Sequence, residues 1–179
     1  LALEGCLVHH TNLDRRGINP LKDIGLFVRY LKLIQRIRPS VVLTYTIKPN
    51  IYGGLCARLL KTPYITNITG LGSAFEKEGM LKKLVTFLYR TALKKAECVF
   101  FQNEKNRDLF TELGITGKKS RLVPGSGVNL QRFVPLDYPE GDKTEFVFIS
   151  RIMKEKGADQ YLDAAEAIRK KYPNTVFHV

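Results

Sequence analysis

The side chains best suited to chemistry are Arg151 and Lys156, which stand five positions apart and directly before Gly157. They follow a short apolar segment, residues 146–149, and precede a helix-like run. In an α/β protein such a strand-to-helix turn lies at the carboxyl end of a strand, where the first N–H groups of the helix favour an anion. The turn is therefore predicted to bind a diphosphate. A solvated charge cluster over residues 154–156 at the start of the helix is the alternative.

A second pattern lies on a long helix expected over residues 79–96. The residues at positions i, i+4, i+7 and i+11 share one face, and they are Lys83, Phe87, Arg90 and Lys94. The stripe expected to pack against the core consists of Met80, Leu81, Leu84, Leu88 and Ala92. Basic side chains around an exposed ring indicate a surface that faces an anionic membrane. A solvated outer face without a partner is the alternative.

Other patterns carry less chemistry. His9 and His10 are adjacent at an expected strand end and point to opposite faces, which argues against joint metal ligation by this pair. Gly70 and Gly72 lack the third glycine and the spacing of a dinucleotide-binding fingerprint. Ser73 has no evident histidine partner for nucleophilic catalysis. Nucleic-acid-binding motifs are absent from the sequence, so no nucleic acid is expected as a partner.

These residues must be positioned by an alternation of strands and helices. Strands are expected at residues 6–9, 41–45, 64–68, 98–102, 121–123, 146–149 and 175–179. Helices are expected over residues 19–39, 50–60 with Asn50 as the cap, 79–96, 104–114 and 158–172. This alternation predicts an α/β fold, with a parallel sheet and helices on both faces. Because ligands of such sheets bind at the carboxyl ends of the strands, one rim is expected from residues 9–16, 46–50, 69–73, 102–104, 125–132 and 150–157.

Charge divides the chain into two parts. Residues 1–135 hold 22 Lys and Arg against 9 Asp and Glu, a charge of +13, and the remainder carries −1, in agreement with the total of +12. A field of this size attracts polyanions or an anionic membrane. Two prolines and Gly141 mark residues 135–142 as an interdomain linker. We therefore expect a first domain over residues 1–134 and the first βαβ portion of a second domain over residues 143–179.

The composition is that of a globular protein, with 44% hydrophobic residues. Its three cysteines, Cys6, Cys56 and Cys98, form no close-spaced pair, so neither a disulfide framework nor a zinc site is expected, and a reducing cytoplasm fits best. The sequence contains no uninterrupted apolar run of about 18 residues. Because the first residues lack a signal peptide and an initiator Met, the chain is expected to begin within a longer protein.

Five motifs occur in an order that one enzyme family shares. They are residues 46–53 (TIKPNIYG), 68–72 (ITGLG), 101–104 (FQNE), 123–129 (VPGSGVN) and the turn from Arg151 to Gly157. Together they resemble glycosyltransferase family 4, particularly the bacterial members that extend sugars on undecaprenyl diphosphate for capsule, O-antigen or N-glycan assembly. The resemblance implies the GT-B architecture, in which two Rossmann-like domains flank a cleft. The first domain mostly holds the acceptor, and the second mostly holds the nucleotide sugar.

The resemblance also implies roles for individual residues. Arg151, Lys156 and Gly157 match the site for the donor diphosphate. The interdomain loop that lines the cleft is matched by Gly125, Ser126, Gly127 and Asn129. The acceptor-side loops are matched by Lys48, Asn50, Thr69, Gly70, Gly72 and Ser73. The family usually needs no metal, so no cofactor is expected beside the UDP-sugar substrate. Many relatives carry His where residues 69–72 stand here, which leaves the catalytic acid/base or orienting residue unnamed.

The expected function is that of a retaining hexosyl- or N-acetylhexosaminyltransferase. It moves a sugar from a UDP donor to a polyprenyl-diphosphate-linked saccharide, in the cytoplasm and peripheral to the inner membrane. The chain is expected to be a fragment truncated at both ends and inactive alone. Two alternatives stay open: a GT-B nucleotide-sugar epimerase, which needs no membrane face, and a non-enzymatic module that binds polyanions or membranes and leaves the Arg151 turn unoccupied.

Overall fold

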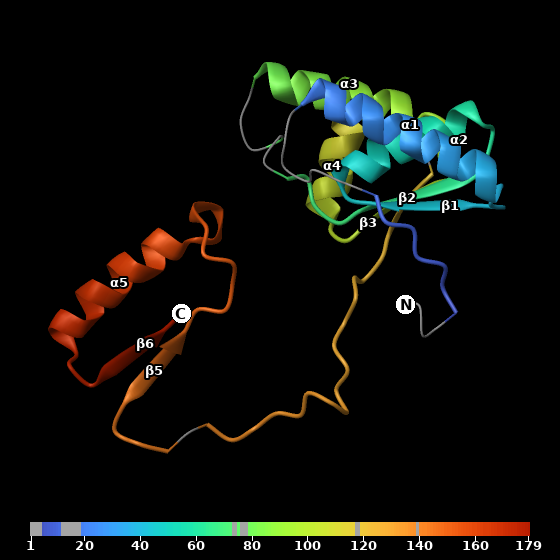
Figure 1. Cartoon of the computed structure of the whole chain (residues 1–179). Coiled ribbons are helices and arrows are strands. Elements are labelled where there is room, and N and C mark those ends of the chain that lie inside the picture. Colours follow the sequence, from blue (N-terminus) through green and yellow to red (C-terminus); the bar gives the residue numbers. More distant parts are fainter. Residues whose placement is uncertain (1–4, 12–18, 73–74, 76–78, 117–118, 139) are drawn as a thin grey trace. The chain divides into compact units, whose positions relative to one another are not determined.

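The computed structural model describes residues 5–11, 19–72, 75, 79–116, 119–138 and 140–179. The chain divides into two compact units, Leu1–Gly127 and Val128–Val179 (Figure 1). The described residues of the expected linker, 135–138 and 140–142, form neither helix nor strand. Its role as a domain boundary stays a prediction.

The first unit is built on a parallel four-stranded sheet. Its strands are β1 (Val42–Tyr45), β2 (Tyr64–Ile68), β3 (Cys98–Phe101) and β4 (Ser120–Leu122), which pair in the order β1-β2-β3-β4. All four were predicted to within about a residue. The strand predicted at residues 6–9 is wrong, because Leu7 and Val8 are exposed and this segment pairs with none of the described strands.

The helices of this unit are α1 (Pro20–Ile37), α2 (Gly54–Leu59), α3 (Met80–Leu93) and α4 (Glu104–Glu112). Local chemistry determines where they begin. Asn19 accepts the N–H groups of Leu21 and Lys22, and Pro20 occupies the first helical position, where its missing N–H costs nothing. Asn103 caps α4 in the same way through the N–H of Asn106.

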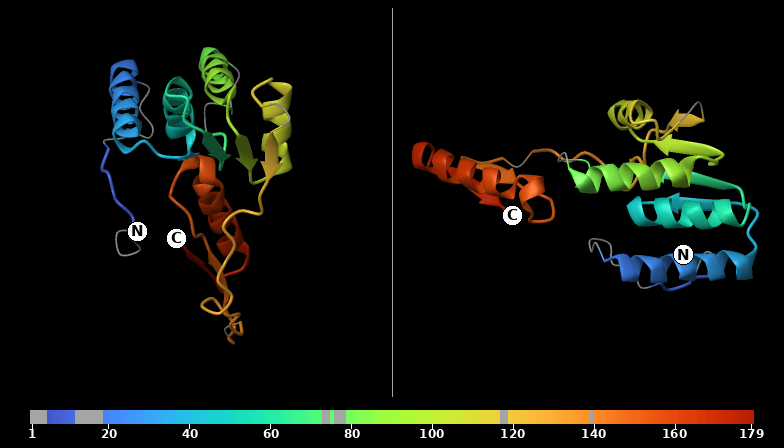
Figure 2. Two further views of the ribbon diagram at one scale, coloured as in Figure 1. Left: turned by 90° about the vertical axis from the view of Figure 1, so that its right-hand side faces the viewer. Right: turned by 90° about the horizontal axis from the view of Figure 1, so that it is seen from above.

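All four helices lie on one face of the sheet (Figure 2). The strands follow one another across the sheet in the order β1-β2-β3-β4. Because right-handed crossovers join them in this one direction, each connecting helix lies on the same side of the sheet. The parallel α/β prediction is therefore confirmed, but the second layer of helices predicted for the opposite face is not found among the described residues. Leu43 and Tyr45 are consequently exposed there.

Aromatic residues dominate the core between this sheet and its helices. Tyr89 of α3 and Phe101 of β3 pack edge-on against Phe110 of α4, with ring centroids 5.1 and 5.4 Å apart respectively. The hydroxyl of Tyr64 in β2 donates to the carbonyl of Ala92 in α3. These contacts fix α3 and α4 over the middle of the sheet.

The second unit is one βαβ element with a small core. It comprises β5 (Thr144–Val147), the 3₁₀ turn η4 (Lys154–Lys156), α5 (Ala158–Lys171) and β6 (Thr175–His178), and β5 and β6 pair in parallel. The hydroxyl of Tyr161 lies 3.1 Å from the carbonyl oxygen of Phe146 and 2.9 Å from that of His178, so it joins α5 to both strands. Phe146 stacks on Phe177 with ring centroids 4.8 Å apart.

Candidate functional site

The turn that carries Arg151 and Lys156 follows β5 and leads directly into α5, as predicted, although β5 lies two residues earlier than the strand expected at residues 146–149. The N–H of Gly157 donates to the carbonyl of Lys154 at 3.0 Å, and the N–H of Lys156 donates to that of Met153 at 3.0 Å. These bonds close η4. Gly157 has φ +82°, a left-handed conformation that favours glycine, and it serves as the N-terminal cap of α5. A glycine at this position therefore lets the chain turn sharply from η4 into the helix.

This turn combines the features of an anion-binding site. Arg151 and Lys156 are both exposed, and the first N–H groups of α5 point out of the helix start, where the helix dipole favours negative charge. Glu155 in the turn and Asp159 in the first turn of α5 carry the opposing charge. Two cations and a helix N-terminus on one turn suit a diphosphate, and the assignment of these residues to a donor stays a prediction.

On the first unit, the loops after β1 and β2 are in contact with each other. Gly72 has φ +66°, and a Cβ added to it would lie 2.6 Å from Cδ1 of Ile47. A side chain at position 72 would therefore be both strained and obstructed. Thr46 also has a positive φ of 66°, which is rare for a β-branched residue and recurs at functional sites. The predicted acceptor-side loops after β1 and β2 thus meet at Ile47 and Gly72 and form one rim.

Lys48 in this rim is held by a residue that sequence reasoning missed. Its Nζ lies 2.6 Å from Oδ1 of Asp23 on α1, and the two side chains are only 15% and 16% exposed. The hydroxyl of Tyr52 donates to the other carboxylate oxygen of Asp23 at 3.1 Å. Burial, followed by the charge of Asp23 and this hydrogen bond, raises the pKa of Tyr52 to about 12. The sequence did contain a signal for this role. Asp23 lies three and four positions before Leu26 and Phe27, which face inward, so it shares their side of α1.

Asn50 does not cap a helix as predicted. It lies inside a π-helical segment, η2 (Pro49–Gly53), which runs into α2. Asn50 is buried, and its Nδ2 donates to the carbonyl of Asn67 at 3.0 Å, so it ties the rim to β2. Its Oδ1 is buried without a hydrogen-bond partner, as is Oδ1 of Asn67. Single π-helical turns of this kind often occur at functional sites.

The remaining predicted residues lie in less confined positions. Thr69 and Gly70 are exposed, and Ser73 lies outside the described residues. Gly125, Ser126 and Gly127 follow β4 and are exposed, and both glycines have positive φ. Oδ1 of Asn129 accepts the N–H groups of Gln131 and Arg132 at 3.0 Å each, so Asn129 shapes the turn after this loop.

The packing predicted for α3 is wrong in part. Met80 is 87% exposed and Leu84 is 51% exposed, whereas the buried residues of this helix are Val85, Thr86, Tyr89, Ala92 and Leu93. The helix is rotated from the predicted orientation because Tyr89 packs against Phe110. Lys83, Phe87 and Lys94 are exposed as expected. Arg90 is also exposed, but its Nε donates to the carbonyl of Leu113 at 2.6 Å, so it also joins α3 to the end of α4.

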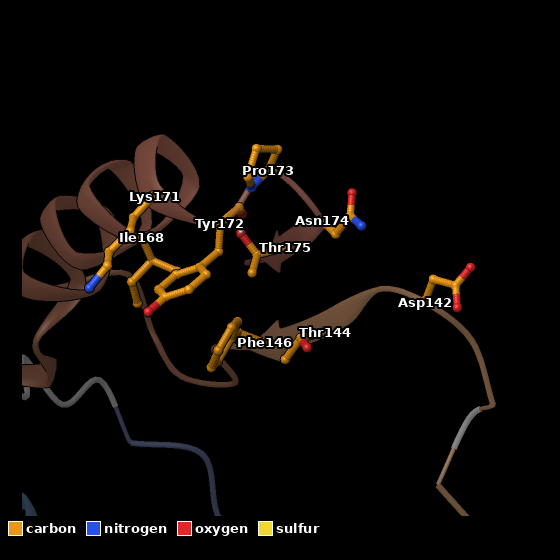
Figure 3. A pocket seen from close by; sticks show the side chains of 9 residues that line it. All are labelled: Asp142, Thr144, Phe146, Ile168, Lys171, Tyr172, Pro173, Asn174 and Thr175. Carbon is orange, nitrogen blue, oxygen red and sulfur yellow. Dashed lines mark hydrogen bonds between the residues drawn. The ribbon is translucent and has the colours of Figure 1, made fainter.

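One hollow in the second unit is unsuited to a donor. Its volume is about 660 Å³, and its lining includes Thr144, Phe146, Tyr172 and Thr175 (Figure 3). Thr144 and Thr175 are the first residues of β5 and β6. The hollow therefore lies at the amino ends of the strands, opposite to the Arg151 turn, and away from the edge where parallel sheets bind ligands.

A family model described as glycosyl transferase 4-like matches residues 1–103, which include the whole rim of β1 and β2. The chain belongs to this glycosyl transferase 4-like family. The match confirms the predicted resemblance.

Two known proteins are similar to this glycosyl transferase 4-like chain over more than residues 1–103. One is the N,N'-diacetylbacillosaminyl-diphospho-undecaprenol alpha-1,3-N-acetylgalactosaminyltransferase of Campylobacter jejuni, 27% identical over 176 residues, which cover 88% of this chain and 46% of that protein. The other is the structure of MnaA from S. aureus with UDP, at 17% identity and a TM-score of 0.54, covering 90% of this chain and 47% of that one. The chain thus spans about half the length of each. The structural likeness supports the GT-B fold, which was predicted.

In the described ranges of this glycosyl transferase 4-like chain, no group of three or more His, Cys, Asp or Glu side chains is arranged to hold a metal ion. None of the helices in the described part of the chain combines the length and apolar character that a membrane crossing requires. The expectation that the protein needs no cofactor stays a prediction.

Proposed function

We propose that this chain forms the acceptor side and the start of the donor side of a retaining glycosyltransferase. Its donor is a UDP-sugar, with a hexose or N-acetylhexosamine, and its acceptor is a saccharide on a polyprenyl diphosphate. One observation carries the proposal: the similarity to the Campylobacter jejuni transferase covers 88% of this chain, and the name of that enzyme specifies a diphospho-undecaprenol acceptor. The proposed product would serve surface polysaccharide or glycan assembly, such as that of capsule or O-antigen.

In the proposed reaction, the bond between the anomeric carbon of the sugar and the UDP oxygen breaks, and UDP leaves with the electron pair. An acceptor hydroxyl forms the new bond and gives up its proton to the departing UDP, so the step balances. Arg151 and Lys156 would hold the diphosphate and stabilise the charge that develops on the departing UDP. Support comes from their exposed position on the turn before α5, at the carboxyl end of β5.

We also propose that the protein works in the cytoplasm, peripheral to the inner membrane. A polyprenyl-linked acceptor resides in the bilayer, so the acceptor side must approach an anionic lipid surface. The charge of +13 on residues 1–135 supports this arrangement, as do the exposed Lys83, Phe87 and Lys94 on α3.

Product analysis tests the proposal. A full-length protein containing this chain would be incubated with a panel of UDP-sugars and polyprenyl-diphosphate saccharides, and the products identified by mass spectrometry and NMR. Transfer with retained anomeric configuration is expected. A UDP-sugar of changed configuration without any transfer would identify the epimerase alternative and overturn the proposal. Absence of any product across the panel would favour the non-enzymatic module.

A further inference from the structure

The outward face of α3 is apolar along its centre and basic along one side. Met80, Leu84 and Phe87 follow at i, i+4 and i+7, so they form one strip, and Phe87 is 63% exposed. Lys83 and Lys94 flank this strip. A helix with apolar and basic strips side by side on its solvent face is typical of elements that lie in a membrane interface.

The outward face of α1 repeats the pattern. Leu21, Ile24 and Val28 follow at i, i+3 and i+7, and Leu21 and Ile24 are 80% and 60% exposed. Lys32 lies on the same face and is also exposed. The inward residues of α1 are different ones, because Leu26 and Ile34 are its buried apolar side chains. No sequence pattern had marked this helix as a contact surface.

The two helices belong to one layer. Both views in Figure 2 show α1, α2 and α3 side by side on the same face of the sheet, with the short α2 in the middle. The contacts of α2 with both neighbours agree with this order. The exposed apolar side chains of α1 and α3 therefore belong to the side of the unit that faces away from the sheet. Exposed apolar residues gathered in this way mark an interaction surface.

We propose that the outward faces of α1 and α3 together form a membrane-docking surface, and that Leu21, Ile24, Met80, Leu84 and Phe87 insert between the lipids of an anionic bilayer. The inference rests on the proposed membrane-linked acceptor and extends it from one basic helix to two inserting helices. The occupant is a lipid surface because lysines border both apolar strips, in a segment of charge +13.

A second copy of the chain is a poorer occupant. A two-fold interface would bring the same lysine-bordered faces together, and like charges facing each other oppose association. An anionic bilayer instead gains from each lysine near its surface and accepts the apolar strips between its acyl chains.

Single tryptophans can report insertion, because the chain contains no Trp. The variants are Leu21→Trp on α1, Phe87→Trp on α3, and Leu162→Trp on α5 as the matched control, since Leu162 is also an exposed helical leucine. Each protein is mixed with phosphatidylcholine–phosphatidylglycerol vesicles. The emission of the first two is expected to shift to shorter wavelength and to be quenched by brominated lipid, whereas the control stays unchanged. A shift at Phe87→Trp alone would overturn the assignment of α1.

Paired polar substitutions measure how much the insertion of apolar side chains contributes to vesicle binding. Leu21→Gln/Ile24→Gln and Leu84→Gln/Phe87→Gln leave the charge unchanged, and each is expected to lower the vesicle partition coefficient by about tenfold or more. The matched control, Ile149→Gln/Leu162→Gln, also removes two exposed apolar side chains and should bind as the parent does. Circular dichroism verifies that each variant is folded.

The outcomes separate this inference from the proposed function, because the vesicles contain neither donor nor acceptor. Equal partition of the parent and both paired variants would overturn the docking surface and leave the transferase untouched. A different outcome is that analytical ultracentrifugation detects a dimer of the parent that the paired substitutions dissociate, with no change in vesicle binding. In that case a second copy of the chain would occupy this surface, and the proposal would be wrong.

Discussion

The ion pair between Asp23 and Lys48 stabilises the rim after β1, and its contribution to the free energy of unfolding can be measured. Replacing Asp23 by Ala removes the carboxylate that binds both Lys48 Nζ at 2.6 Å and the Tyr52 hydroxyl at 3.1 Å. Both charged side chains are about five-sixths buried, at 16% and 15% exposure. The substitution would therefore leave an ammonium group without its carboxylate in a poorly solvated place.

The burial of this pair determines the expected magnitude. Removing one partner of a buried pair costs about 3–5 kcal/mol, and the partial exposure here favours the lower end, so we expect Asp23→Ala to lower the free energy of unfolding by roughly 3 kcal/mol. Tyr52→Phe deletes only one hydrogen bond and should cost about 1 kcal/mol. Replacing both charges, as in Asp23→Leu/Lys48→Met, should recover much of the loss, because neither charge of the pair remains to be desolvated.

Urea unfolding followed by circular dichroism measures these values, and a matched control lies in the same unit. Glu97 and Lys119 also form an ion pair, 3.3 Å apart, but their side chains are 57% and 64% exposed. Glu97→Ala should therefore cost less than about 1 kcal/mol. A second control is Glu166→Ala, which removes an exposed pair with the same 2.6 Å separation as the buried one. If Asp23→Ala were no more destabilising than these two, burial would not strengthen the Asp23 pair and our account of the rim would fail.

Three other predictions concern the donor turn, alkaline stability and the irregular stretch. Arg151→Ala or Lys156→Ala in the full-length protein should lower kcat/KM for the UDP-sugar at least about tenfold, because each removes a charge-assisted contact to diphosphate; unchanged rates at subsaturating donor in both would refute the site. Burial raises the pKa of Cys56 to about 12, and burial with Asp23 does the same for Tyr52. Folding thus favours the neutral form of both groups, so their contribution to the free energy of unfolding should be complete below about pH 9 and should fall as the pH approaches 12. A tyrosinate absorbance titration with parallel circular dichroism would measure this loss. A free energy of unfolding that stays constant over that range would contradict the prediction. Limited proteolysis should cleave within residues 128–142, where the described residues are exposed and irregular, before it cleaves within residues 20–123, and the reverse order would show that the boundary is misplaced.

Much of the fold could be predicted because its signals are local. Tyr64–Ile68 was predicted to the residue, since a short β-rich run between a proline and a glycine-bearing turn has few other interpretations. The start of α1 followed from Asn19 and Pro20, whose capping chemistry acts within one helical turn. The Arg151 turn was located for the same reason, because strand, turn and helix are consecutive there.

What the sequence did not reveal depends on partners far along the chain. Apolar residues surround more than half of α3, so periodicity could not decide which of them are buried; the contact of Tyr89 with Phe110 on α4 decided it and left Met80 and Leu84 exposed. The same limit applies to Asn50, because its local sequence predicts a helix cap, whereas its hydrogen bond to the carbonyl of Asn67 joins it to a residue 17 positions away.

The order of the elements, the family motifs and the residues available at the strand ends can be read from the sequence of this protein alone. Which side chains those residues meet depends on how the helices pack on the sheet. Asp23 and Lys48 lie 25 positions apart, and no local preference links them. They pair because the packing of α1 against the segment after β1 brings a carboxylate and an ammonium group into the same sparsely solvated space, where opposite charges are strongly favoured over unpaired ones.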